Sequence, residues 1–432
     1  MKDIKKPDFM KAAIQTRSHN AVLEVLIALL VMFIGEILMG ILQVPMLIVY
    51  LLGNAEYRQM VLQYSVDFDK ITRILQNIPE WFILVNLVLE VGLIAIFILY
   101  CRFFEKRKAN TLGFCKKKCV VEYLKGILIG ATVFVAAYAI CLLTGSVKIR
   151  TNVITGTTVL YVIGFFIGYL IQGMAEEVIC RGYFMVSLTR RYHVSTAVLM
   201  SAILFSMLHG SNPGITFLAY INIFLFGIFL SLLFVRYENI WVVGAVHSIW
   251  NFLQGNVFGV QVSGMSVQTS LFGSAFNENV LMNGGSFGME GGFAVTLALL
   301  AANALVLWDM SKHECFVQAE PVDNPYDREA FQKMFSQQTP YPGNGQDVFY
   351  QNGSRTKQNG SDFRQEPYHQ GNESPEGYRQ ENGWQQTQMS RPEKKGGYEN
   401  MGVNPEETPW RPNNEREQEN AQTVFDQNYF KD

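Results

Sequence analysis

The sequence lacks the signatures of several well-known kinds of site. Its 6 cysteines are scattered along 432 residues, which predicts free thiols and neither a disulfide framework nor a zinc knuckle. It contains no HExxH segment, the helix on which many metalloproteases hold zinc. The glycine-rich string GGSFGMEGG is not followed by a lysine at Walker spacing, so we expect a flexible outer loop there and no phosphate site.

Long apolar runs are frequent before residue 310 and missing after it. The chain is 49% hydrophobic and 13% aromatic, and a helix needs about 20 apolar residues to cross a membrane. The sequence therefore predicts an all-α fold, a polytopic transmembrane helix bundle of about eight spans. The expected spans are residues 21–44, with 45–53 as an extension, 82–101, 124–144, 158–188, 194–209, 214–235, 239–258 and 292–308.

The spans divide the chain into three parts. Residues 1–20 are an N-terminal segment and residues 21–310 are the membrane bundle. Residues 311–432 are rich in Gln, Asn, Gly, Glu and Pro and have no apolar periodicity. Such a segment cannot bury enough surface to offset its chain entropy, so a disordered C-terminal tail is predicted. A solvated extension is its expected role, and binding of cytoplasmic proteins is the alternative.

Lysine and arginine indicate the orientation of the bundle. They collect in the first twenty residues and in the turn 102–118 after the second span, and such basic segments face the cytoplasm. We therefore expect a multi-pass protein of the cell membrane with both termini cytoplasmic. The first span is too long for a signal peptide and no convincing cleavage site follows it, which predicts an uncleaved anchor.

Polar side chains within the expected spans are the candidates for a functional site. Glu176 and Glu177 lie in the middle of a long apolar run, and a carboxylate there costs about 2.5–3.5 kcal/mol on insertion scales. His209, His247 and Asn251 lie in neighbouring runs. Counted from the cytoplasmic ends, Glu176 and these three fall at similar depths of roughly 12–22 Å. We expect them to meet in a buried polar site.

Helical spacing separates the two glutamates. Residues four apart share a helix face, whereas sequence neighbours do not. Glu177 and Arg181 are four apart and are predicted to form an ion pair, which leaves Glu176 to point elsewhere. The sequence suggests no partner for three other glutamates in the spans, which are Glu24, Glu36 and Glu90.

An enzyme and a non-enzymatic membrane protein both remain possible at this point. A lone histidine or asparagine in a membrane bundle more often joins helices than catalyses, and a non-enzymatic immunity or scaffold protein would need no chemistry. A proton-coupled transporter would use the carboxylates as a relay, although the spans lack the internal repeats of such proteins. Together with the paired acids, the histidines and Asn251 favour catalysis.

Three strings resemble the motifs of a known family. They are EEVICR (176–181), FSMLH (205–209) and HSIWN (247–251), in the order found in the CPBP intramembrane proteases. This family includes the type II CAAX prenyl endopeptidases and the bacterial Abi and bacteriocin-immunity proteins. The resemblance covers about residues 80–310 and looks like the bacterial branch.

The resemblance implies an intramembrane endopeptidase. Its substrate would be a membrane-associated peptide or protein, prenylated or of bacteriocin type, and its partners would include the lipid bilayer but no nucleic acid. Carried over by position, Glu176 and His209 would activate a water molecule, while His247 and Asn251 would stabilise the oxyanion. Glu177 and Arg181 would brace the helix.

The resemblance also raises the question of a metal cofactor. The family is often labelled metalloprotease, and Glu176, His209 and His247 would be the ligands of a zinc ion. An asparagine stands where a further ligand would be expected. We therefore favour a water activated by glutamate over an obligatory metal.

Overall fold

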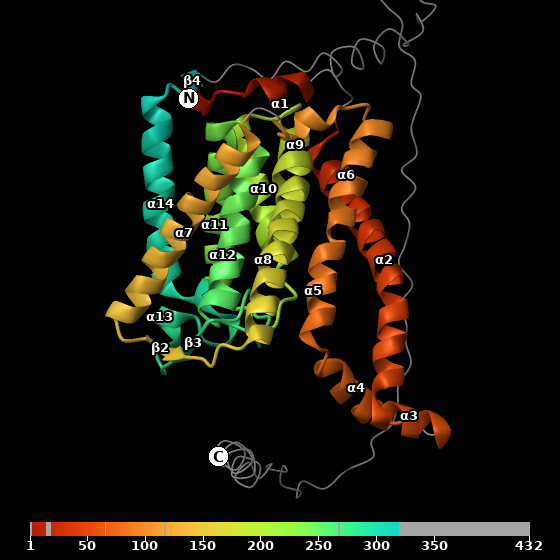
Figure 1. The fold of residues 1–432 in the computed structure, drawn as a ribbon. Coiled ribbons are helices and arrows are strands. Elements are labelled where there is room, and N and C mark those ends of the chain that lie inside the picture. The colour runs from red at the N-terminus through yellow and green to blue at the C-terminus, as the bar shows by residue number, and fades with distance from the viewer. Residues whose placement is uncertain (1, 14–18, 65, 116–117, 267, 319–432) are drawn as a thin grey trace, which may run out of the picture. The chain divides into compact units, whose positions relative to one another are not determined.

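The computed structural model describes residues 2–13, 19–64, 66–115, 118–266 and 268–318. Helices dominate this part of the chain (Figure 1), and all of it belongs to one compact unit. The all-α bundle expected from the sequence is confirmed. Residues 319–432, which hold almost all of the expected disordered tail, lie outside the described residues.

Within the described residues, six stretches of helix are long and apolar enough to cross a membrane. They are α2 (Ala21–Gly53), α5 with α6 (Glu80–Leu89 and Val91–Phe103), α7 (Cys119–Leu143), α8 with η2 and α9 (Gly156–Glu177, Val178–Met185 and Val186–Leu188), α11 (Phe217–Tyr237) and α14 (Phe293–Lys312). The shorter apolar helices are α10 (Val194–Leu208) and α12 (Ile240–Phe252), which continues into η3 (Leu253–Val257). Six of the eight expected spans are therefore long and apolar enough to cross a membrane, and α10 and α12 lie where the other two were expected.

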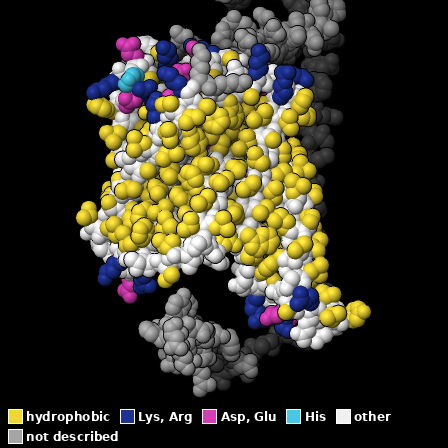
Figure 2. Space-filling model, in the orientation of Figure 1, with side chains coloured by type: hydrophobic (Ala, Val, Ile, Leu, Met, Phe, Trp, Pro, Cys, Tyr) yellow, Lys and Arg dark blue, Asp and Glu magenta, His cyan; other side chains and the backbone are white. Residues whose placement is uncertain are grey.

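The surface agrees with a membrane environment. In Figure 2 hydrophobic side chains cover the middle of the visible face, and lysine, arginine and acidic side chains gather at its two ends.

The remaining helices are short: α1 (Asp8–Ala13), α3 (Ala55–Leu62), α4 (Phe68–Gln76), η1 (Ala109–Leu112), α13 (Val280–Asn283), η4 (Gly285–Phe287) and η5 (Met289–Gly291).

Two small antiparallel sheets lie at opposite ends of the bundle (Figure 1). Strand β1 (Lys2–Ile4) pairs with β4 (Phe316–Gln318), so both ends of the described chain meet on one side. Strand β2 (Val147–Thr151) pairs with β3 (Phe272–Phe276) at the other end. Helix α14 and β4 carry regular structure to residue 318, into the segment assigned to the tail from its sequence.

Helix α12 lies at the centre of the bundle because glycines let its neighbours approach. A Cβ placed on Gly173 of α8 would lie 2.7 Å from the backbone nitrogen of Ser248, and one on Gly126 of α7 would lie 2.3 Å from the carbonyl oxygen of Val242. Both contacts are shorter than a real Cβ tolerates, so α12 packs directly on two backbones. This burial brings the side chains of α12 close to those of α8.

Glu24 has a partner that the sequence did not suggest. Its Oε1 accepts a hydrogen bond of 2.9 Å from Arg190 Nη2. The same nitrogen donates to Glu105 Oε1 at 2.9 Å, and Arg107 Nη1 donates to Glu105 Oε2 at 2.9 Å. All four side chains are buried. These three ion pairs therefore join α2, the turn after α6 and the turn after α9 in one network.

The glycine-rich string at 284–292 differs from its prediction as a flexible outer loop. It forms the turns η4 and η5, and Phe287 and Met289 within it are 0% exposed. Gly284 has φ 84° and its Cβ would lie 2.0 Å from the carbonyl oxygen of Gly288. The glycines here permit a tight, packed turn.

Candidate active site

Glu177, the last residue of α8, is fully buried and accepts two hydrogen bonds on one oxygen. Arg181 Nη1 donates to its Oε1 at 2.8 Å, which is the ion pair expected from the spacing. His247 Nδ1 lies 2.9 Å from the same Oε1. Because Nδ1 carries the proton in this contact, the carboxylate fixes the ring and turns Nε2 the other way. The sequence did not reveal this link to His247.

Glu176 faces the opposite way and meets both histidines. Its Oε2 lies 3.8 Å from His209 Nε2 and 3.8 Å from His247 Nε2. Its Oε1 accepts a hydrogen bond from the side chain of Gln172, one helical turn earlier. Two imidazoles from different helices thus point at one carboxylate oxygen.

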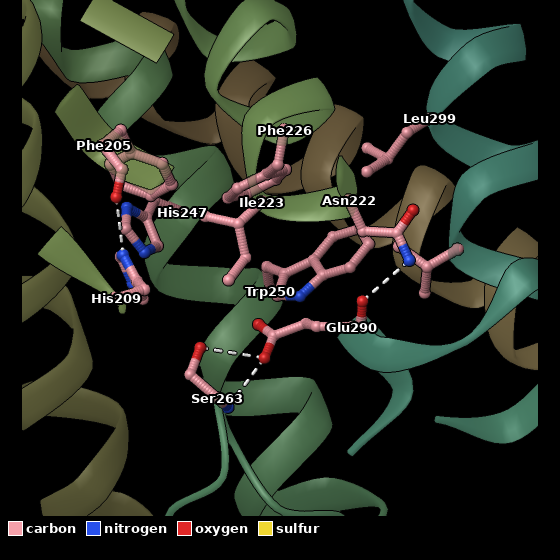
Figure 3. Close-up of a pocket in the computed structure, with 11 residues that line it drawn as sticks. Phe205, His209, Asn222, Ile223, Phe226, His247, Trp250, Ser263, Glu290 and Leu299 are labelled. Carbon is pink, nitrogen blue, oxygen red and sulfur yellow. Dashed lines mark hydrogen bonds between the residues drawn. The ribbon is translucent and has the colours of Figure 1, made fainter. Parts of the chain in front are cut away.

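His209 is held by the residue that opens its own motif. It closes α10, and its Nδ1 donates a hydrogen bond of 2.8 Å to the carbonyl oxygen of Phe205 (Figure 3). The Phe205 ring also lies 4.4 Å from the guanidinium carbon of Arg181, a cation–π contact. Phe205 therefore orients His209 through its backbone and contacts Arg181 through its side chain.

Asn251 joins the site through a residue that sequence reasoning missed. Its Nδ2 donates to Gln172 Oε1 at 2.9 Å, and Gln172 in turn donates to Glu176. Gln172 lies four residues before Glu176, the one signal in the sequence that places both on the same face of α8. All six expected site residues therefore lie together: Glu176, Glu177, Arg181, His209, His247 and Asn251.

Comparison with known families decides the relationship of this region. Residues 158–253 match the family described as type II CAAX prenyl endopeptidase Rce1-like. Residues 158–253 are an Rce1-like domain. The domain contains all three motifs, and the family match supports its assignment as a CAAX-type intramembrane protease. No curated protein and no solved structure gave a match.

The Rce1-like domain opens onto two cavities that share Glu176 and His209. The larger has a volume of about 590 Å³ and is also lined by His247 and Asn251. The smaller has a volume of about 280 Å³ and is also lined by Cys180 and by two glutamates without an expected partner, Glu36 and Glu90. A cavity with polar groups converging on an otherwise apolar wall is typical of a binding site. The 590 Å³ cavity is large enough for several residues of a peptide.

The ligand geometry of the Rce1-like domain does not fit a zinc ion. Zinc holds its ligand atoms at about 2.0–2.3 Å, which brings them within roughly 4 Å of one another. Glu176 Oε2 meets this distance with each histidine, but ligand atoms of all three residues do not come within 4.8 Å of one another. In the described parts of the chain only His19, Glu24 and Glu105 do so, and Arg190 already binds both of these glutamates.

Proposed function

We propose that the protein is an intramembrane endopeptidase that hydrolyses a peptide bond with water activated by Glu176. The observation that carries this proposal is the convergence of His209 Nε2 and His247 Nε2 on Glu176 Oε2. At 3.8 Å each histidine is too far from Glu176 for a direct hydrogen bond. A water molecule can instead bridge the carboxylate and an imidazole.

Glu176 is the general base in this mechanism. It takes a proton from the water as the oxygen attacks the peptide carbonyl, and His209 Nε2 orients the same water. The Nδ1 of His209 donates a hydrogen bond to the carbonyl oxygen of Phe205, so Nε2 is the ring nitrogen that can contact the water. When the tetrahedral intermediate collapses, Glu176 returns the proton to the leaving amine. Positioned acid–base catalysis of this kind contributes about 10²- to 10⁴-fold in rate.

His247 and Asn251 stabilise the oxyanion. The Nδ1–H bond to Glu177 directs Nε2 into the site, and in this mechanism Nε2 carries a proton and donates it as a hydrogen bond to the developing negative charge. The amide of Asn251, held by Gln172, is the second donor. Removing one such donor in a site that excludes water costs about 10²- to 10³-fold in kcat.

The substrate is a membrane-associated peptide or protein, prenylated or of bacteriocin type, that enters the 590 Å³ cavity. Besides the catalytic groups, apolar side chains such as Phe165 and Val262 line this cavity, which suits an apolar segment of the substrate. We place the protein in the cell membrane with both termini of the chain on the cytoplasmic side. The basic residues around β1 support this orientation.

Reconstituted protein tests the proposal. In liposomes, the wild-type chain should cleave a membrane-anchored fluorogenic peptide, and Glu176→Gln should reduce kcat by at least about 10²-fold. The matched control is Glu56→Gln, which changes an exposed glutamate of α3 and should leave kcat unchanged. A Glu176→Gln protein with full activity would exclude the mechanism.

A further inference from the structure

A third, small cavity lies behind the two catalytic histidines (Figure 3). The volume in which the centre of a water molecule fits is about 20 Å³. The residues that line the cavity include His209, His247, Trp250, Ser263 and Glu290. Glu176 is not part of its wall, whereas His209, His247 and Ser263 line both this cavity and the 590 Å³ cavity. About 10–15 Å³ suffices to hold a water molecule, and the space is too small for a substrate side chain of any length.

Trp250 presents an unsatisfied donor at this cavity. Its side chain is 1% exposed, and its Nε1–H has no hydrogen-bond acceptor among the described residues. The ring packs edge-on against Phe134, with centroids 5.3 Å apart, and against Phe226 at 5.0 Å. Such packing prevents the indole from turning toward another acceptor. Since a buried donor without a partner costs about 1–3 kcal/mol, Nε1–H requires an acceptor supplied through the cavity.

Glu290 supplies a fixed carboxylate on the same wall. Its Oε2 accepts hydrogen bonds from Ser263 N at 2.7 Å and Ser263 Oγ at 2.9 Å (Figure 3). Its main-chain oxygen accepts from Asn222 Nδ2 at 2.8 Å, which anchors the backbone. Burial raises the pKa of Glu290 above its usual value, although the hydrogen bonds from Ser263, the nearby His209 and the side chain of Gln254 oppose this shift. A further donor such as water would stabilise the charged form in the same way.

Ser263 connects this carboxylate to the turn that carries His209. Its carbonyl oxygen accepts a hydrogen bond of 3.0 Å from Asn212 Nδ2. The backbone nitrogen of Asn212 donates to the carbonyl oxygen of His209 at 3.1 Å. Four residues, Glu290, Ser263, Asn212 and His209, are therefore linked in series from the outer loop to the site.

We propose that the small cavity binds one ordered water molecule, which accepts from Trp250 Nε1–H and donates to the Glu290 carboxylate, and that Glu290 is a positioning residue for His209. The role of Glu290 rests on the proposed proteolysis, whereas the water site does not. No covalent step is involved. The water completes the hydrogen bonding of Trp250 Nε1–H and of the Glu290 carboxylate. The hydrogen-bonded pair of Glu290 and Ser263 holds, through Asn212, the turn that follows His209.

Ultraviolet resonance Raman spectroscopy of the full-length protein tests the water site independently of activity. The chain has 6 tryptophans, so the difference between wild type and Trp250→Phe isolates the indole band that reports hydrogen bonding at Nε1. A hydrogen-bonded band that shifts toward the free N–H position in Glu290→Leu is expected. A free N–H band in the wild type, or the same band in Glu290→Leu, would overturn the water site.

Kinetics tests the positioning role. Glu290→Gln and Ser263→Ala should each lower kcat, by up to about 10²-fold for a displaced catalytic group, with KM unchanged. Glu278→Gln, an exposed glutamate on the same outer side, is the control. Unchanged kcat in both variants overturns the positioning role, as does a rise in KM alone. Inactive wild-type protein would instead contradict the proposed function and with it the positioning role, and the Raman result would still decide the water site.

Discussion

His247 donates from Nδ1 to the oxygen of Glu177 that also accepts from Arg181, at 2.9 and 2.8 Å. The second glutamate of the EEVICR motif therefore serves two partners. It neutralises a buried arginine, and it orients a ring on another helix. The brace role inferred from the sequence covers only the first of these tasks.

A double-substitution experiment separates the two tasks of Glu177. Glu177→Gln leaves Arg181 as an unpaired buried charge and should destabilise the protein by about 3–5 kcal/mol. Adding Arg181→Met removes that charge and should restore most of the stability, but His247 still lacks its carboxylate, so activity should stay low. Thermal unfolding in detergent and peptide cleavage measure the two effects. Recovery of full activity in the double variant would show that Glu177 only braces the helix.

Gln172→Met tests the bridge between Asn251 and Glu176. The substitution keeps the volume of the side chain but removes both hydrogen bonds. We expect kcat to fall by about tenfold or more because one oxyanion donor loses its support. The fold should persist, since Gln172 lies on a cavity wall. Cleavage assays on Gln172→Met and Gln172→Glu proteins check this, and wild-type kcat in the methionine variant would contradict the bridge.

The network around Arg190 should matter for stability and not for chemistry. Glu24→Gln removes one buried partner of Arg190, and a broken buried pair costs about 3–5 kcal/mol. Cleavage per folded molecule should be unchanged, because this network lies outside both cavities that contain Glu176. Asp8→Asn, which breaks the exposed pair with Lys11, is the control and should leave thermal unfolding nearly unchanged. Equal thermal unfolding of the two variants would show that burial adds nothing here.

Truncation distinguishes the strand after α14 from the residues beyond it. A chain ending at Gln318 keeps the β1–β4 pairing and should insert, fold and cleave a short peptide like the full-length protein. A chain ending at Lys312 loses β4 and should be less stable. Loss of peptide cleavage in the longer truncation would show that the tail contributes to catalysis. Loss of only a cellular substrate would indicate that the tail recruits partners.

Chelation tests the metal question. Because the ligand atoms of Glu176, His209 and His247 are too far apart for one zinc ion, peptide cleavage should survive removal of metal by a chelator. Metal content and kcat should be measured on the same samples. Activity that disappears on chelation and returns with zinc would show that the site contracts around a metal.

The sequence predicted the parts of this protein that depend on local pattern. Apolar runs identified the helices, and i, i+4 spacing identified the Glu177–Arg181 pair. Similar depths in the spans also indicated that Glu176, His209 and His247 meet. Most individual contacts between helices could not be predicted. Neither Arg190 as the partner of Glu24 nor the carboxylate behind His247 follows from spacing, because helix packing alone brings them together. Glu290 was hidden for a second reason: it lies in a glycine-rich string whose composition is typical of a loose loop.

Pairing of β1 with β4 has a consequence for biosynthesis. Lys2–Ile4 is synthesised before the helices of the bundle, yet its partner Phe316–Gln318 follows α14. The first strand must therefore wait until α14 has been made and inserted, and contacts so distant along the chain form late. Closing this strand pair would mark the completion of the bundle, so a bulky N-terminal fusion should delay maturation more than the same fusion placed after residue 318.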